Sequence, residues 1–168
     1  MATDPAATAP PLHSDLAALA PLLGTWEGEG HGSYPTIDAF GYGEQVRFWH
    51  NGKPFLAYSQ RTWALDDGRP LHAESGYLRG RPGGLVELTM AHPTGLVELL
   101  AGTVASEGDG CRIELASTLV AGTATAKRVD AVTRTVVVRG EVLTYDLAMA
   151  AVGQPLTHHL RAELDHKA

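Results

Sequence analysis

Most of the chain alternates between apolar and polar residues with a period of two, the spacing typical of half-buried β-strands. The alternation begins near Trp26 and is divided by turn sequences such as NGKP, DDGRP, RGRPGG, HPTG and SEGDG. A first strand is expected within GTWEGEGHGSYPTI. The other predicted strands cover residues 47–50, 55–63, 71–78, 85–91, 95–104, 112–120, 124–129, 134–138, 142–152 and 156–164.

One segment before the strands has a helical pattern. In LHSDLAALAPLLGTW, the apolar residues Leu16, Leu19 and Leu22 recur at helical spacing, and Ser14 or Asp15 offers an N-cap. A proline near the end of this segment interrupts or restarts the helix, and a glycine ends it. We therefore expect one short helix ahead of the strands.

About ten short strands with hairpin-type links predict an all-β fold, a ten-stranded antiparallel up-and-down β-barrel with a short N-terminal helix. Closing the sheet removes exposed strand edges, and ten strands leave more room inside than eight. Periodicity alone leaves open a flattened sandwich with a filled core. Residues 1–12, rich in Ala, Thr and Pro, are expected to form a flexible tail, and residues 13–168 a single domain.

Composition narrows the function classes. The 168 residues are 44% hydrophobic and carry a net charge of −6, which argues against nucleic acid as a partner. No apolar run is long enough to span a membrane, and the N-terminus has no basic residue ahead of an apolar core, so we expect a cytoplasmic protein. The single Cys111 cannot form an internal disulfide and is expected to be a buried apolar residue.

The first strand carries a G-x-W-x-G-x-G pattern formed by Gly24, Trp26, Gly28 and Gly30. It lacks the βαβ context and the Lys-Ser/Thr pair of a phosphate loop. Alternate small residues would let the barrel wall bend or let a flat ligand approach the backbone, while Trp26 plugs the barrel end. The pattern is similar to the first strand of lipocalins and fatty-acid-binding proteins, and it favours a ligand-binding barrel.

Four glutamates are candidates for paired catalytic carboxylates: Glu44, Glu74, Glu87 and Glu98. They lie on different predicted strands, and the sequence places no two of them at a glycosidase-like separation, so we expect surface or barrel-interior carboxylates. Ser75 lacks a nucleophile-elbow context. A hydrolase is therefore not indicated.

Two adjacent histidines, His158 and His159, lie in the last predicted strand, PLTHHLRAEL. In a regular strand, His158 shares a face with Leu156, Leu160, Ala162 and Leu164. His159 shares the opposite, polar face with Thr157, Arg161 and Glu163. Alternation alone therefore places His158 inward.

The chain resembles the nitrobindin family of small haem-binding barrels. The matching stretches are LLGTWEGEGHGSYPTI, GKPFLAYSQRTW, PLHAESGYLR, TGLVELLAGT, TAKRV and MAAVGQPLTHHLRAEL, which run in order over nearly the whole domain. In the family, the histidine of P-L-x-x-H-L-x-A-x-L is the axial ligand of haem iron. This resemblance implies one haem b per subunit with His159 as its ligand, and it requires the polar face of the last strand to point inward.

The resemblance implies further pocket residues. Thr36 matches a position that contacts the haem edge, and Lys127 matches a basic position that can pair with a propionate, although a solvated strand lysine is equally compatible with its sequence. His72, His92 and Met149 match residues that line the family's pocket. None of these three is expected to be a ligand, and an exposed turn histidine remains an alternative description of His92, which precedes a proline.

The activity that the resemblance implies is the isomerisation of peroxynitrite to nitrate at ferric haem, together with binding of nitric oxide. The alternative is a non-enzymatic carrier or sensor that holds haem, nitric oxide or a lipophilic ligand. Apolar strand faces on the outside of a barrel also favour a homodimer.

Overall fold

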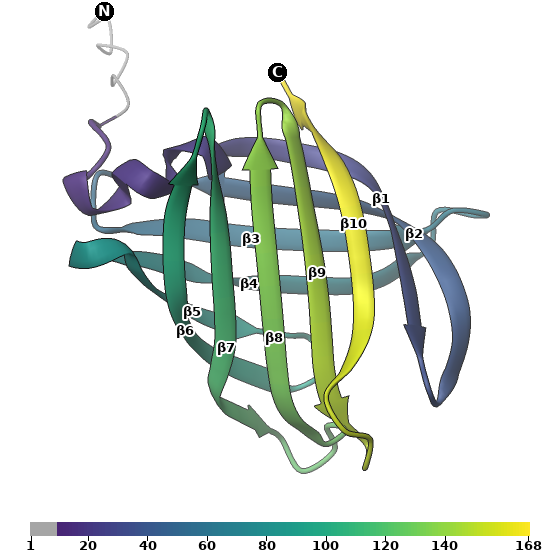
Figure 1. Cartoon of the computed structure of the whole chain (residues 1–168). Helices are drawn as coiled ribbons and strands as arrows, with labels where there is room; N and C mark the ends of the chain where they lie inside the picture. Colours follow the sequence, from purple (N-terminus) through teal and green to yellow (C-terminus); the bar gives the residue numbers. More distant parts are fainter. Residues whose placement is uncertain (1–9) are drawn as a thin grey trace, which may run out of the picture.

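The computed structural model describes residues 10–168, which form a closed barrel of ten strands (Figure 1). Each strand pairs antiparallel with the next one in the chain, and pairing of β1 with β10 closes the ring. The strands are β1 (Gly24–Tyr34), β2 (Ile37–Trp49), β3 (Phe55–Ala64), β4 (Pro70–Arg81), β5 (Leu85–Ala91), β6 (Leu96–Glu107), β7 (Gly110–Gly122), β8 (Val129–Arg139), β9 (Val142–Ala151) and β10 (Thr157–Lys167). The predicted up-and-down barrel is confirmed, and the flattened sandwich is wrong.

The predicted helix is a 3₁₀ helix, η1 (Ser14–Leu22), that lies against one end of the barrel. Its fully buried leucines, Leu16, Leu19 and Leu22, are spaced by three residues, which matches the three residues per turn of a 3₁₀ helix. The expected N-cap at Ser14 or Asp15 is wrong: His13 is the N-cap, and its Nδ1 accepts a hydrogen bond from the backbone N–H of Asp15 at 3.2 Å.

The largest differences from the predicted strands are at residues 124–129 and at the start of β2. Residues 124–129 were expected to form a strand, but only Val129 does, and the residues before it form the turn between β7 and β8. The strand β2 begins at Ile37, well before the predicted residues 47–50. A second 3₁₀ turn, η2 (Pro82–Gly84), links β4 to β5.

The glycine and tryptophan pattern of β1 serves packing. Trp26 is 1% exposed, and its Nε1–H donates to the backbone oxygen of Leu22 at 2.8 Å, so the side chain plugs the barrel end as expected. A Cβ at Gly30 would lie 2.3 Å from the ring of Tyr42, and one at Gly28 would lie 2.2 Å from the backbone oxygen of Glu163. The small residues therefore make room for the protein's own atoms and not for a flat ligand.

The apolar core is concentrated where η1 meets the barrel. Leu56, Leu143 and Leu164 are fully or almost fully buried there together with the leucines of η1. Cys111 is buried, as expected, and burial raises the pKa of its thiol to about 11.

Residues 1–9 of the predicted tail lie outside the described residues. Leu12, which also belongs to the predicted tail, is partly buried against the core. The boundary between tail and domain stays a prediction. Among residues 10–168, no helix is long and apolar enough to cross a membrane.

Candidate functional site

A cavity of about 720 Å³ opens at the end of the barrel away from η1. Its walls come from the β3–β4 and β5–β6 turns and from the neighbouring parts of β2, β8, β9 and β10. Apolar side chains, including Leu71, Leu96, Val129, Met149 and Leu160, line it near the mouth. Buried polar side chains, among them Gln60, Glu74 and Glu98, also line it, so the cavity combines apolar walls with a polar floor.

A β-bulge places His159 in this cavity. Along the β9–β10 pairing, His158 is opposite Ala148 and Leu160 is opposite Leu147, so His159 is an extra residue without a partner on β9. Such an insertion reverses the alternation of a strand. Both His159 and Leu160 therefore line the cavity.

The bulge corrects the expectation that the whole polar face of the last strand points inward. Arg161 and Glu163 are exposed, whereas Ala162 and Leu164 are buried. His158 lies outside, with Nε2 3.1 Å from Asp146 Oδ1. The prediction from regular alternation, which put His158 inward, is wrong because it assumed an uninterrupted strand.

The hydrogen bonding of His159 defines the state of its ring. Nδ1 lies 3.0 Å from the backbone oxygen of Ser33, and since a carbonyl only accepts, Nδ1 carries the proton. The neutral ring thus keeps its lone pair on Nε2. Burial lowers the pKa of His159, while the bond to Ser33 acts in the opposite direction. The rings of Tyr34 and Phe40 flank the imidazole at 5.4 and 6.5 Å between centroids.

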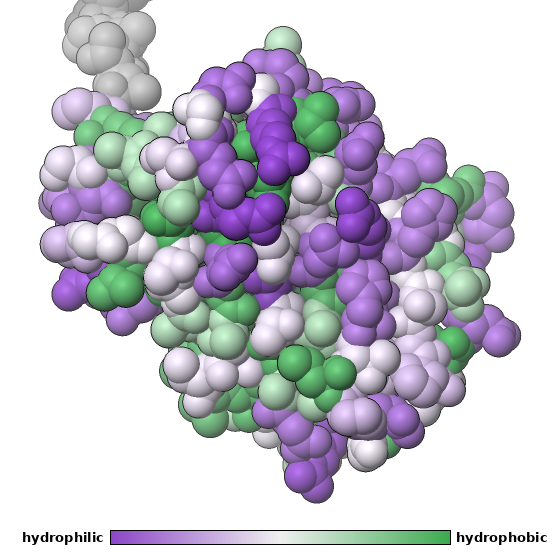
Figure 2. Space-filling view, viewed as in Figure 1, coloured by the Kyte–Doolittle hydropathy of each residue, from purple (hydrophilic) through white to green (hydrophobic). Residues whose placement is uncertain are grey.

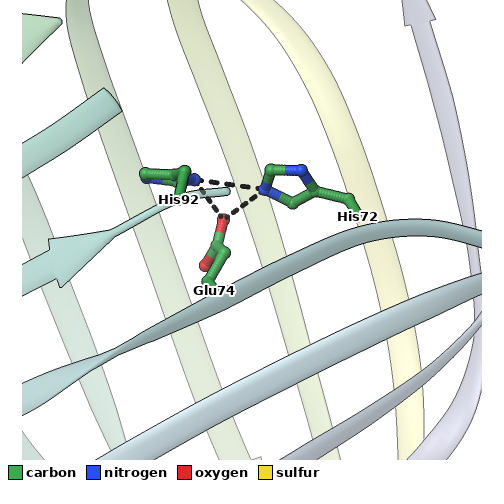
Figure 3. A group of neighbouring side chains, drawn as sticks. All are labelled: His72, Glu74 and His92. Carbon is green, nitrogen blue, oxygen red and sulfur yellow. Dashed lines mark hydrogen bonds and ion pairs between the residues drawn. The ribbon is translucent and has the colours of Figure 1, made fainter. Parts of the chain in front are cut away.

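The structure brings together three of the other predicted pocket residues. His72, His92 and Met149 line the same cavity as His159. The side chain of His92 is 5% exposed, so its description as an exposed turn histidine is wrong. Its Nδ1 lies within hydrogen-bond distance, 3.1 Å, of His72 Nε2, and Figure 3 shows both rings pointing toward Glu74.

Two predicted contacts lie away from the cavity lining. Thr36 is exposed in the turn between β1 and β2. Lys127 is exposed in the β7–β8 turn, and not on a strand, two residues before Val129 of the cavity wall. The contacts of both residues with a haem stay predictions.

The floor of the cavity contains a buried arginine between two buried carboxylates. Arg134 on β8 donates from Nη1 and Nη2 to the two oxygens of Glu74 on β4, both at 3.0 Å. Nη2 also lies 3.3 Å from Glu98 on β6. Burial alone would raise the pKa of Glu74, but the charge of Arg134 holds it well below its usual range.

A third carboxylate, Glu44 on β2, has only neutral hydrogen-bond donors. Gln60 Nε2 donates to it at 2.9 Å and the hydroxyl of Tyr145 donates at 2.8 Å. Burial raises the pKa of Glu44 to about 7, although both hydrogen bonds lower it. Burial also raises the pKa of Tyr42, whose hydroxyl lies 2.8 Å from that of Tyr145.

Sequence reasoning did not predict this network. It left the four glutamates as surface or interior groups, and the structure places Glu44, Glu74 and Glu98 inside and Glu87 outside beside Arg79. No sequence motif marks Arg134 as a site residue. One sequence pattern could have indicated that Arg134 points inward. In VTRTV it lies two positions from Val132 and from Val136, and both valines face the interior of the barrel. No single-strand pattern shows that such residues meet across the barrel.

A closed barrel with one histidine nitrogen free to bind a ligand in a large cavity defines the class of small ligand-binding or cofactor-binding barrels. Residues 15–166 match the model of the THAP4-like, heme-binding beta-barrel domain. The chain belongs to this family, which confirms the nitrobindin resemblance.

Named relatives agree over nearly the full length. The chain is 53% identical over 153 residues to a peroxynitrite isomerase of Nocardia farcinica, covering 91% of each chain. It is 53% identical over 157 residues to peroxynitrite isomerase 2 of Mycobacterium marinum, covering 94% of this chain and 98% of that one. The crystal structure of Rv2717c from M. tuberculosis superimposes with a TM-score of 0.92 at 48% identity, covering 94% of this chain and 100% of that one.

The residues around the cavity fit the haem that the family description names. Neutral imidazole is a common ligand of haem iron, and a hydrogen bond from its other ring nitrogen to a carbonyl is the usual way in which such a ligand is oriented. His159 meets both conditions through its bond to Ser33. The apolar side chains near the mouth suit the faces of a porphyrin.

Proposed function

We propose that the chain binds one haem b through Nε2 of His159 and isomerises peroxynitrite to nitrate. The observation that carries this proposal is the orientation of His159, whose Nδ1–H is held by Ser33 so that the other nitrogen is free. The names of the relatives from Nocardia farcinica and Mycobacterium marinum support the reaction.

The protein's own part is to hold the ligand neutral and in place. The lowered pKa of His159 favours the neutral ring that a metal requires, and Tyr34 and Phe40 restrict its rotation. When bound, haem supplies an iron with one protein ligand and one position open to a small anion or a diatomic gas. Nitric oxide binding is part of the same proposal because it would use this open position.

The other residues expected in the pocket lie on the cavity wall or beside it. The imidazoles of His72, on β4, and His92, which directly follows β5, line the cavity across the ring from β10. Lys127 is exposed beside the cavity wall and has a long side chain, which suits the proposed pairing with a propionate. Thr36 follows two residues after Tyr34, which contacts the ring of His159, and this supports a place at the haem edge.

The decisive experiment compares His159→Ala with His158→Ala, a matched control because His158 is the adjacent histidine and lies outside the barrel. Haem is added to each variant, and the Soret band and the stopped-flow decay of peroxynitrite are measured. We expect His159→Ala to lose the wild-type Soret band and the accelerated decay, and His158→Ala to keep both. A wild-type Soret band in His159→Ala would contradict the site assignment.

The rate of peroxynitrite decay distinguishes an isomerase from a carrier or sensor. If wild-type protein with haem binds nitric oxide but decomposes peroxynitrite no faster than haem-free protein, the isomerase proposal is wrong and the sensor role is favoured. The cytoplasmic location expected from the sequence stays a prediction.

We further propose a homodimer formed through the outer wall of β2–β7. Across these strands, consecutive register partners form one row on the outer face: Trp49, Ala57, Tyr77, Thr89, Leu99 and Leu119. Trp49, Tyr77, Leu99 and Leu119 in this row are at least 40% exposed. On the wall of β7–β10, by contrast, polar and apolar side chains are interspersed (Figure 2).

Contiguous exposed apolar side chains favour association. Light scattering is expected to give twice the mass of one chain for the wild type and the mass of one chain for Leu99→Glu. A wild-type mass of one chain at micromolar concentration would contradict the dimer.

A further inference from the structure

Three potential metal-ligand atoms converge in the cavity, apart from His159. His72 Nε2 and His92 Nδ1 are 3.1 Å apart, and each lies 3.7 Å from Glu74 Oε1 (Figure 3). His72 and Glu74 occupy alternate positions on β4, and His92 directly follows β5, the strand paired with β4. The barrel register therefore brings the three side chains to one point.

The triangle has the size that a bound metal ion requires. Nitrogen and oxygen ligands at about 2.0–2.2 Å from a tetrahedral Zn²⁺ lie about 3.3–3.6 Å from one another. The observed separations of 3.1–3.7 Å span this range. An ion placed between the three atoms needs only small side-chain adjustments.

The groups behind the triangle have the arrangement found around metal ligands. His92 Nε2, the ring nitrogen away from the triangle, lies 3.1 Å from Glu98 Oε1. A carboxylate behind a ligating imidazole is the usual orienting partner in metal sites. Arg134 holds Glu74 from the opposite direction, and a carboxylate oxygen has two lone pairs, so Oε1 can accept from Arg134 and still face an ion.

The charge of the neighbouring buried groups also favours a cation here. Arg134 is the only buried cation facing Glu44, Glu74 and Glu98 among the described residues, so the cluster is negative even when Glu44 is protonated. When Glu44 is ionised, the three carboxylates and Arg134 leave a net charge of −2, which a divalent ion would balance.

We propose that His72, Glu74 and His92 form a binding site for a divalent first-row transition-metal ion of the Zn²⁺ class. Two imidazoles with one carboxylate favour such an ion over Mg²⁺ or Ca²⁺, which prefer all-oxygen ligand sets. The strands β4 and β5 lie four and five places around the ring from β10, so this site is across the cavity from His159. It requires no haem and goes beyond the proposed function.

The test is calorimetric titration of Zn²⁺ into haem-free and haem-loaded protein, with Mg²⁺ as the comparison ion. We expect one Zn²⁺ per chain in both forms and no saturable binding of Mg²⁺. Absence of saturable Zn²⁺ binding by the wild type in both forms would overturn the proposal.

Variants locate the ion. His72→Ala and His92→Ala should each weaken Zn²⁺ binding by more than the 10- to 100-fold that loss of an outer hydrogen-bonding partner costs, and Glu98→Gln should fall within that range. His158→Ala and His159→Ala should bind Zn²⁺ like the wild type. Unchanged binding in the double variant His72→Ala/His92→Ala, or loss of binding in His159→Ala, would overturn the site.

Two further measurements keep the result clear. Circular dichroism without metal checks that each variant is folded; His72 is 34% exposed, so its truncation should leave the core intact. X-ray absorption at the zinc edge of the wild type should show two imidazoles, a carboxylate oxygen and a fourth ligand from solvent. A different set of protein ligands would contradict the proposal without recourse to variants. His159→Ala should lose haem binding and keep Zn²⁺ binding. The proposed Zn²⁺ site can therefore be tested even if the proposed haem binding by His159 is wrong.

Discussion

At the end of the barrel next to η1 the interior is filled by apolar side chains, whereas at the other end it holds ionised groups and a cavity. Leu16, Leu19 and Trp26 are at most 1% exposed at the first end. At the second, Glu74 and Arg134 are buried as an ion pair beneath the mouth. Burying charges costs free energy that apolar packing does not, so the closed end must supply the stability that the open end lacks.

The difference in stability between the two ends of the barrel should be largest at Trp26. Trp26→Ala should lower the free energy of unfolding of the haem-free protein by about 3–5 kcal/mol, because it empties the plugged end and removes the bond to Leu22. Urea denaturation measures the loss. The haem affinity of the folded variant should stay within about threefold of the wild type, because the cavity with His159 is at the other end of the barrel. A threefold change corresponds to less than the 1.4 kcal/mol of a tenfold change. A loss below about 1 kcal/mol would mean that stability is spread evenly over both ends.

At the open end, Glu44 should make stability depend on pH. Its pKa in the folded protein is about 7 against 4.5 for a free side chain, so its protonated form is favoured by folding. Protonated Glu44 therefore contributes fully to the free energy of unfolding below pH 4.5, and this contribution is lost as the pH rises through 7. At 1.36 kcal/mol per pKa unit, the loss is up to about 3 kcal/mol.

Glu44→Gln should remove that loss, because the amide stays neutral at every pH. Gln60 can rotate its amide so that Oε1, which has no partner in the wild type, accepts from the new amide. Urea unfolding at pH 5 and pH 8 should show a smaller decline for Glu44→Gln than for the wild type. An equal decline in both proteins would contradict the assignment.

A smaller effect is expected at Tyr34, which ties β1 to the end of β9. Its hydroxyl accepts from the backbone N–H of Ala151 at 3.0 Å and donates to the backbone oxygen of Met149 at 3.1 Å. Tyr34→Phe should cost about 1–2 kcal/mol in unfolding free energy because the buried N–H loses its acceptor. Thermal and urea denaturation measure it, and a neutral result would indicate that water replaces the hydroxyl.

The smallest effect belongs to His158, outside the barrel. His158→Ala removes an exposed contact with Asp146 and should change the free energy of unfolding by less than about 0.5 kcal/mol. The same denaturation experiment measures it. A loss above 1 kcal/mol would show that the outer wall contributes more to stability than its exposure indicates.

Much of the fold follows from the sequence because its signals are local. The three-residue spacing of Leu16, Leu19 and Leu22 marks η1, and turn sequences mark the hairpins. Residues 124–129 were predicted wrongly because Ala and Thr alternate there without burying either face. The segment instead folds as a turn, with Ala126 N–H bonded to the backbone oxygen of Thr123 at 3.0 Å.

The site was less predictable because it depends on pairing between distant strands. The bulge at His159 is a property of the β9–β10 register, so the sequence of β10 alone gives the wrong inward residue. The resemblance to nitrobindin corrected the choice of histidine but not the explanation. The cluster of His72, Glu74 and His92 likewise arises only when β4 and β5 are placed side by side.

The extra residue in β10 also determines how deep in the barrel the imidazole lies. A strand rises about 3.4 Å per residue, and side chains return to the same face every second residue. Moving the bulge two positions along β10 would carry an inward histidine about 7 Å along the strand, from the mouth toward the floor. The depth of a bound group in this barrel can therefore be changed by one insertion and one deletion, without redesigning any neighbouring strand.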